Sequence, residues 1–313
     1  AMRLAAGLAA LLGLMASWLQ APATAGGRFT LAKTIPSRIL GRPITYTIYR
    51  PDSRQAGARF PVLYLLHGLG DNENAWLEHG GIRQTLDRLI DSGRIKPLIV
   101  VMPMAGNSWY VDDARKAGYG PMARALGEDF IAGIDGRYHT HACRERRALG
   151  GLSMGGYGAM LHAFGHPDRY SAAISLSGSL FRPELAGDPA WRQRLSRIFG
   201  GVFGDPFDPA RFMTWNIFPR VEKVAKAGNL PAVWLAAGDD DFSSILDGTV
   251  KLHQVLLRRR AVTQLRIDDA GHTWSYWSKA IVPALEWLSP RLEAKCADQP
   301  RNGKAGAQRA ANR

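Results

Sequence analysis

Residues 147–164 read RALGGLSMGGYGAMLHAF, and this stretch decides the fold. A short apolar run, Ala148–Leu152, leads into Gly151-Leu152-Ser153-Met154-Gly155, and a helical pattern over Met154–Phe164 follows at once. A serine in so tight a strand-to-helix turn needs small neighbours, because larger side chains would hold the strand and the helix apart. The hydroxyl then stands clear of the sheet, above a helix N-terminus that favours negative charge. The stretch predicts a nucleophile, Ser153, rather than a serine that only caps a glycine-rich helix.

Around this turn, short apolar runs alternate with segments of helical period. The expected strands are 44–49 (alternating, as in an antiparallel strand), 61–66, 97–102, 148–152, 172–176, 233–237 and 265–269. The expected helices are 82–92, 122–138, 154–164, 245–259 and 275–292. Such alternation predicts an α/β fold with a mostly parallel central sheet and helices on both of its faces.

One long segment interrupts the alternation. Residues 179–229 are rich in Pro, Trp and Phe and lie between two expected strands. An insertion at this place is expected to cover the strand tips as a cap, and not to form a second domain. The chain shows no internal repeat.

Composition narrows the class of protein. With 313 residues, 46% of them hydrophobic and 21% charged, the chain is apolar enough for a large core. Two cysteines exclude a disulfide-dense scaffold and a four-thiolate zinc site. The net charge of +13 is compatible with binding to nucleic acid or to an anionic envelope surface. The basic residues are scattered and not gathered with aromatic ones, so we expect no nucleic acid and leave open a weak envelope association.

The two ends of the chain differ from its body, which predicts one domain over residues 26–296. Residues 1–25 have the pattern of a signal peptide, with Arg3, an apolar run over Leu4–Leu19, and Ala23-Thr24-Ala25 before the expected cleavage. The alternative is a membrane anchor, but sixteen residues at about 1.5 Å each are short for a hydrocarbon core of roughly 30 Å. Export to the periplasm or the medium is therefore expected. Residues 297–313, with four basic residues and one acid, are expected to form a disordered tail.

Export permits a disulfide. Cys143 precedes the expected strand 148–152, and Cys296 follows the expected last helix. If that helix runs antiparallel to the strands, both sulfur atoms lie at the end of the sheet away from the strand tips. A bridge is the favoured interpretation, with two unpaired thiols as the alternative.

A nucleophilic serine needs a base, and the base needs an acid that holds its tautomer. Four histidines follow Ser153, and only His272 lies in a loop after the last expected strand; the others are His162, His166 and His253. The acid is expected just past strand 233–237, where Gly238-Asp239-Asp240-Asp241-Phe242 offers three carboxylates. Three adjacent side chains cannot all reach one imidazole, and spacing alone leaves the choice open.

Acyl transfer also needs donors for the oxyanion. The backbone N–H of Met154 is one candidate, because it follows the nucleophile directly. The N–H of Leu69, in His67-Gly68-Leu69-Gly70, is the other candidate. His67 itself is expected to brace this loop and not to take part in catalysis.

Six separate segments give the chain a resemblance to a known family. They are LLHGLGDNENAW, MPMAGNSWY, GLSMGGYGA, HPDRYSAAISLSG, GDDDF and GHTWSYW, spread between about Ile44 and Leu292. Together they resemble the esterase D group of α/β-hydrolases, which includes S-formylglutathione hydrolases, feruloyl and acetylxylan esterases, and secreted mycolyltransferases. The resemblance implies the α/β-hydrolase fold and makes Asp241 the acid of the triad. The mycolyltransferase-type members use Glu as the acid, and this chain does not.

Aromatic residues crowd the expected strand tips. Trp109, Tyr110 and Trp274 are candidates for an acyl or sugar subsite, with core packing as the alternative; Phe181, Trp215 and Trp277 lie in the same neighbourhood. Residues 71–74 (DNEN) lack the 12-residue calcium pattern and are expected to form a polar rim. No metal and no cofactor is expected.

These features predict a secreted serine esterase that hydrolyses small-molecule or glycan-linked carboxylic esters through a covalent acyl-enzyme. The alternative is an acyltransferase that moves the acyl group to a sugar or glycolipid hydroxyl. A third, less favoured interpretation is an envelope-binding protein without catalysis.

Overall fold

The computed structural model describes residues 26–52 and 57–297. The expected signal peptide, residues 1–25, lies outside the described residues, and so does the expected tail apart from Ala297. Within the described ranges, no helix is long and apolar enough to cross a membrane.

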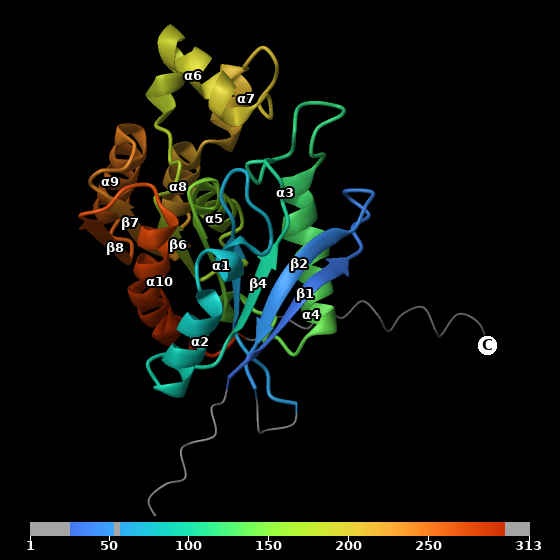
Figure 1. Cartoon of the computed structure of the whole chain (residues 1–313). Coiled ribbons are helices and arrows are strands. Elements are labelled where there is room, and N and C mark those ends of the chain that lie inside the picture. Colours follow the sequence, from blue (N-terminus) through green and yellow to red (C-terminus); the bar gives the residue numbers. More distant parts are fainter. Residues whose placement is uncertain (1–25, 53–56, 298–313) are drawn as a thin grey trace, which may run out of the picture.

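One eight-stranded sheet forms the centre of the molecule (Figure 1). Its order is β1-β2-β4-β3-β5-β6-β7-β8. Strand β2 runs antiparallel to both of its neighbours, β1 and β4, and the strands from β4 to β8 are parallel to one another. The strands are β1 (Arg28–Ile35), β2 (Ile44–Arg50), β3 (Val62–Leu66), β4 (Ile99–Pro103), β5 (Arg147–Leu152), β6 (Ala172–Leu176), β7 (Ala232–Gly238) and β8 (Thr263–Asp268). The fold class expected from the sequence is confirmed: this is the mostly parallel sheet of an α/β-hydrolase.

Helices cover both faces of this sheet. They are α1 (Ala75–Glu78), α2 (Ile82–Asp91), α3 (Met122–Ala125), α4 (Ile131–Arg137), α5 (Met154–Gly165), α6 (Pro189–Phe199), α7 (Pro209–Trp215), α8 (Ile217–Lys226), α9 (Ser243–Arg258) and α10 (Trp274–Leu288). A π-helical turn, Leu126–Phe130, joins α3 to α4 within the segment expected to be one helix. The last expected helix ends at Leu288 and continues as a 3-10 turn over Ser289–Leu292.

Residues along each central strand divide alternately between two hydrophobic clusters. In β3, Leu63 and Leu65 pack in the cluster that holds α2 and α10, whereas Tyr64 and Leu66 pack in the cluster that holds α5, α8 and α9. Because successive side chains of a strand point to opposite faces, a strand covered on both faces must be apolar throughout. This is why the central strands appear in the sequence as continuous apolar runs.

Two features differ from the expectation. The sequence pattern does not predict strand β1, because most of its side chains are exposed and it forms by pairing with β2 at the edge of the sheet.

The segment 179–229, expected to be a cap, forms a cap only in part. Helices α6 and α7 project beyond the strand tips (Figure 1), but α8 packs against α5 on the face of the sheet. A parallel connection from β6 to β7 needs such a crossover helix.

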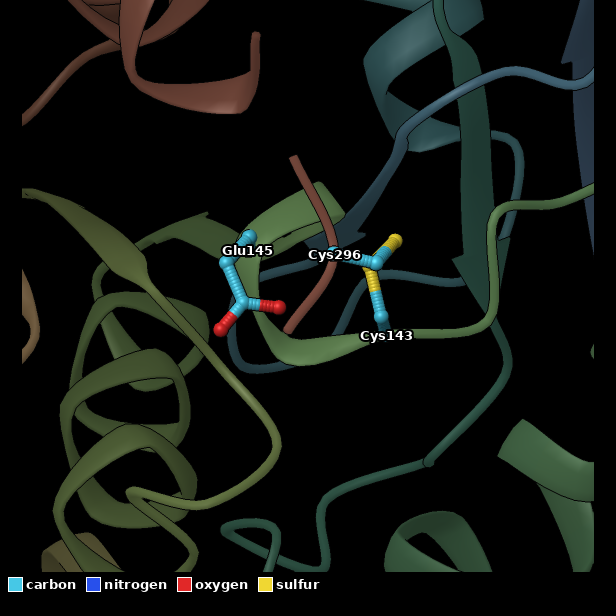
Figure 2. Close-up of side chains that lie close together, drawn as sticks. All are labelled: Cys143, Glu145 and Cys296. Carbon is cyan, nitrogen blue, oxygen red and sulfur yellow. A yellow bond between two sulfur atoms is a disulfide. The ribbon is translucent and has the colours of Figure 1, made fainter. Parts of the chain in front are cut away.

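Cys143 and Cys296 are joined at the amino end of β5 (Figure 2). Their Cα atoms are 5.8 Å apart across a sequence separation of 153 residues. Glu145 lies beside the pair, and its carboxylate accepts a hydrogen bond from the N–H of Ala297 at 3.4 Å. The structure thus ties the segment after the last helix to the start of the strand that carries Ser153.

We expect reduction of this bridge to lower the melting temperature by at least about 5 °C without changing the kinetic constants of the folded protein. A bridge that closes a loop of this length lowers the entropy of the unfolded chain, which stabilises the folded state by up to about 5 kcal/mol in the chain-entropy model. A change of about 1 kcal/mol in the free energy of unfolding shifts the melting temperature of a domain this size by a few degrees. Ser153 lies at the other end of β5, away from both cysteines. Thermal unfolding with and without a phosphine reductant measures the change, with Cys143→Ser/Cys296→Ser as the unreducible control. Activity that fell before the fold melted would contradict this separation.

Candidate active site

Ser153 occupies the turn between β5 and α5 in a left-handed backbone conformation, with φ at 50°. Two glycines of the motif make this turn sterically feasible. A Cβ on Gly151 would lie 2.4 Å from the carbonyl oxygen of Gly155, and one on Gly155 would lie 2.5 Å from that of Leu66. The N–H of Ser153 donates to the carbonyl of Leu176 at 2.9 Å, which anchors the turn to β6. A strained residue fixed in this way is typical of functional positions.

His272 lies in the loop between β8 and α10 and connects two of the other predicted residues. Its Nε2 is 3.0 Å from Oγ of Ser153, and its Nδ1 is 2.9 Å from Oδ1 of Asp241. A carboxylate can only accept, so Nδ1 donates to Asp241 and Nε2 is left to accept the proton of the serine hydroxyl. The ring of Trp277 meets the imidazole edge to face at 4.8 Å between centroids and fixes its orientation.

The three aspartates after β7 have three different surroundings. The Asp241 side chain is fully buried, and its Oδ1 also accepts from the N–H of Phe242 at 2.7 Å. Asp239 accepts instead from the N–H of Ala270 at 3.2 Å, which ties this loop to the His272 loop. Asp240 is exposed. Of the three, the structure brings only Asp241 to the imidazole.

The two N–H groups expected to bind the oxyanion come from the loop after β3, which carries Leu69, and from Met154, the first residue of α5. Within the described residues, neither the N–H of Leu69 nor that of Met154 donates to a protein acceptor. The turn that carries Leu69 is held by the N–H of Gly70, which donates to Oδ1 of Asn107 at 2.7 Å. Backbone donors left unpaired next to a nucleophile can stabilise a developing oxyanion.

His67 is buried and braces this loop, as expected. Its Nδ1 donates to the carbonyl of Gly68 at 2.8 Å, and its Nε2 accepts from the N–H of Ala105 at 3.1 Å. Burial lowers the pKa of His67, because the imidazolium would lose its hydration there. A neutral ring with both nitrogens bonded to backbone groups connects the loops after β3 and β4.

A cavity of about 700 Å³ opens above Ser153 and His272. Trp109 and Trp274, two of the three aromatic residues expected to contact substrate, line it, as do Phe181 and Trp277. Asp71 of the expected polar rim lines it as well.

Tyr110 does not line this cavity, which corrects the expectation. It is fully buried, and its hydroxyl donates to the carbonyl of His67 at 2.9 Å. Trp215 also lies elsewhere: its carbonyl accepts from the Tyr157 hydroxyl at 2.8 Å, and Arg220 stacks on its ring. Both residues therefore have structural positions.

Helix α6 contributes lining residues that the sequence analysis missed. Trp191, Arg194 and Ile198 reach the cavity from one face of this helix. Their spacing of three and four residues is the signal that could have found them, because such positions are neighbours on a helix surface. Among the described residues that line the cavity, Arg194 is the one Lys or Arg, and its guanidinium lies 5.1 Å from the centroid of the Trp191 ring.

Comparison with known proteins relates this chain to esterases. The model of the Putative esterase family matches residues 37–288. The acetyl esterase of Caldicellulosiruptor saccharolyticus is 29% identical over 232 residues, which cover 73% of this chain and 83% of that protein. The diacylglycerol acyltransferase/mycolyltransferase of Mycobacterium leprae is 27% identical over 86% of this chain and 85% of its own. A solved ferulic acid esterase superposes with a TM-score of 0.66 at 26% identity, over 85% of this chain and 98% of its own.

Proposed function

This chain belongs to the esterase family and is a carboxylic-ester hydrolase, and we propose that it works through Ser153, His272 and Asp241 by way of a covalent acyl-enzyme. The observation that carries the proposal is the continuous pair of contacts from Oγ of Ser153 through the imidazole to a buried carboxylate. Because the chain belongs to a family of esterases, the interpretation as a non-catalytic envelope-binding protein has no support.

In the acylation step, Oγ of Ser153 attacks the ester carbonyl while Nε2 of His272 takes the hydroxyl proton. Negative charge develops on the carbonyl oxygen, where the N–H groups of Leu69 and Met154 stabilise it. The bond to the alkoxy group then breaks, and His272 passes the proton to the leaving alcohol. Asp241 stabilises the transient imidazolium and holds its orientation.

In the deacylation step, water takes the place of the alcohol. His272 accepts one proton of the water as its oxygen attacks the acyl carbonyl, and returns it to Oγ of Ser153 when the acyl bond breaks. The products are a carboxylic acid and the regenerated serine.

The direct test combines labelling with a substrate panel. A fluorophosphonate should modify Ser153 stoichiometrically and abolish hydrolysis, with the modified peptide identified by mass spectrometry. The panel should contain p-nitrophenyl esters of increasing acyl length, acetylated xylan and methyl ferulate, since these span small and glycan-linked esters. Hydrolysis that survived full modification of Ser153 would overturn the mechanism.

Transfer to a sugar or glycolipid hydroxyl is the second candidate function. It is supported by the similarity to the mycolyltransferase of Mycobacterium leprae over most of both chains. Both functions share the acyl-enzyme and differ only in what attacks it. Trehalose or another sugar added to a p-nitrophenyl ester assay separates them, because a transferase forms acyl sugar at the expense of free acid whereas a hydrolase does not.

We also propose that the chain is exported. The apolar run over Leu4–Leu19 supports this, and so does the Cys143–Cys296 pair, because disulfides persist in oxidising compartments. Expression of the full chain in a Gram-negative host tests it. A periplasmic protein that begins at Gly26 is expected, and a cytosolic protein with residues 1–25 intact would contradict export.

The positive charge of Arg194 in the wall of the catalytic cavity predicts a preference for an acyl group that ends in a carboxylate. We expect Arg194→Gln to lower kcat/KM for mono-p-nitrophenyl adipate about three- to fivefold, the size of an exposed charge pair, and to leave p-nitrophenyl hexanoate unchanged. The two substrates have the same number of acyl carbons and differ only in the terminal carboxylate. Arg197→Gln is the matched control, because it removes the same charge from α6 at a position that does not line the cavity. Equal losses for both substrates would exclude charge recognition by Arg194.

A further inference from the structure

A second cavity, of about 260 Å³, lies at the opposite end of the sheet from Ser153. Its walls come from the segments that precede β3, β4 and β5 and from the end of α10. Ser153 instead follows the carboxyl end of β5, so the six residues of that strand separate the two sites by on the order of 20 Å. Occupants of the two cavities do not compete for space.

Three cations line this cavity: Arg59, Lys96 and Arg146. Within the described residues, no carboxylate lies within 4.0 Å of any of their charged nitrogens. Glu293 is the one acid in the part of the lining that the structure describes. The cavity therefore carries net positive charge, and low-dielectric walls concentrate such a field.

Arg59 donates to the backbone carbonyl of Thr140 at 2.8 Å, and two further observations concern Arg146 and the charge around it. Nε of Arg146 is buried and has no hydrogen-bond partner among the described residues, a state that costs free energy until an acceptor arrives. His141, which also lines the cavity, has its pKa lowered by burial and then by the charges of Arg146 and Arg59. The positive charges of both guanidinium groups thus act on the imidazole of His141.

A large part of the cavity lining is apolar, although His141, Ser289 and Glu293 also line it. Leu285, Leu288 and Leu292, from the end of α10 and the turn after it, line it together with Ile95 and Leu98, and all five are buried in one hydrophobic cluster. A hydrocarbon chain fits such a wall, while arginine matches a carboxylate in a planar, two-pronged geometry. An apolar cavity with a few convergent polar groups is the usual form of a small-molecule site.

We propose that this cavity is a binding site for a free carboxylate with a short hydrocarbon chain, held by Arg59, Lys96 and Arg146. The anion satisfies Nε of Arg146, and the chain lies along the leucines of α10. The product acids of an esterase belong to this chemical class, which makes the cavity a place where a released acid can bind away from the catalytic serine.

The Cys143–Cys296 bridge keeps the two walls of the cavity together. Arg146 and His141 are close to Cys143 in the chain, and Glu293 and Leu292 are close to Cys296. The sulfur of Cys296 also lies 3.9 Å from the carbonyl oxygen of His141. Reduction is therefore expected to weaken binding in this cavity.

Calorimetric titration of the full chain with octanoate at low ionic strength tests the proposal. Octanol offers the chain without the charge, and inorganic phosphate offers charge without the chain, so both should bind at least about tenfold more weakly. Lys96→Met/Arg146→Met should raise the octanoate dissociation constant at least about tenfold, because charge-assisted hydrogen bonds are lost. Lys223→Met/Arg197→Met is the control, since it removes the same charges from exposed positions on α8 and α6. The single variant Lys96→Met changes only an exposed side chain, and it should show part of the effect without a cost to folding.

Four results would overturn the proposal. Octanoate binding that disappears after Ser153 is blocked by a fluorophosphonate would assign the ligand to the catalytic cavity. Binding unchanged in Lys96→Met/Arg146→Met, or octanol as tight as octanoate, would remove the anion site. Cavity variants that reduce binding to phosphatidylglycerol vesicles but not to octanoate would assign the site to a lipid headgroup.

Discussion

Ser153→Ala is expected to lower kcat for ester hydrolysis by at least about 10³-fold while the protein stays folded. The substitution removes Oγ, the atom 3.0 Å from Nε2 of His272, and with it the acyl-enzyme route. The residual rate should come from the N–H groups of Leu69 and Met154 and from binding alone. Steady-state kinetics on a p-nitrophenyl ester, with circular dichroism and a melting curve on the same preparation, measure both effects.

Ser243→Ala is the matched control for this experiment. Ser243 lines the same cavity and is exposed, and the structure gives its hydroxyl no hydrogen bond to the described residues. We expect its kinetic constants to stay within about twofold of the parent. If a folded Ser153→Ala protein retained most of the activity, the assignment of the nucleophile would be wrong.

Asp241→Asn is expected to lower kcat by about 10³- to 10⁴-fold, far more than the same change at either neighbouring aspartate. The amide fills the same buried space but offers an N–H₂ group where Nδ1 of His272 needs an acceptor. It thus favours the tautomer with the proton on Nε2, which cannot accept from Ser153. It also leaves the imidazolium of the transition state without a counter-charge.

Asp239→Asn and Asp240→Asn serve as controls, because each removes one negative charge from the same loop, as Asp241→Asn does. Asp239 accepts from the N–H of Ala270, and an amide oxygen can still accept there, so we expect a loss below about tenfold. Asp240 is exposed, and its replacement should be nearly neutral. A crippling effect at Asp239 would move the acid of the triad to that residue and leave Ser153 and His272 in place.

The sequence by itself was sufficient for features that depend on local chemistry. The strands buried on both faces are recognisable because every side chain in them must be apolar. The turn at Ser153 is recognisable because Gly151 and Gly155 approach backbone atoms more closely than any Cβ allows. His272 stands out because it alone among the later histidines lies in a loop after a strand. Each of these signals is made by residues that are close to one another in the sequence, so it can be recognised without the structure.

Other features depended on contacts between distant segments. Spacing could not choose among three adjacent aspartates, and the choice of Asp241 before the structure rested on family resemblance; the packing of the β7 and β8 loops against each other brings its carboxylate to His272. Strand β1 is mostly exposed, and its backbone pairs with β2 alone, at the edge of the sheet.

The tertiary structure alone also decided which aromatic and cap residues face the catalytic cavity. Trp109 lines it and its neighbour Tyr110 does not, because the Tyr110 hydroxyl is bonded to the loop of His67. Arg194 lines it because α6 projects over the strand tips. In each case a residue's role depends on which distant segment its side chain meets, and the order of residues along the chain does not contain that information.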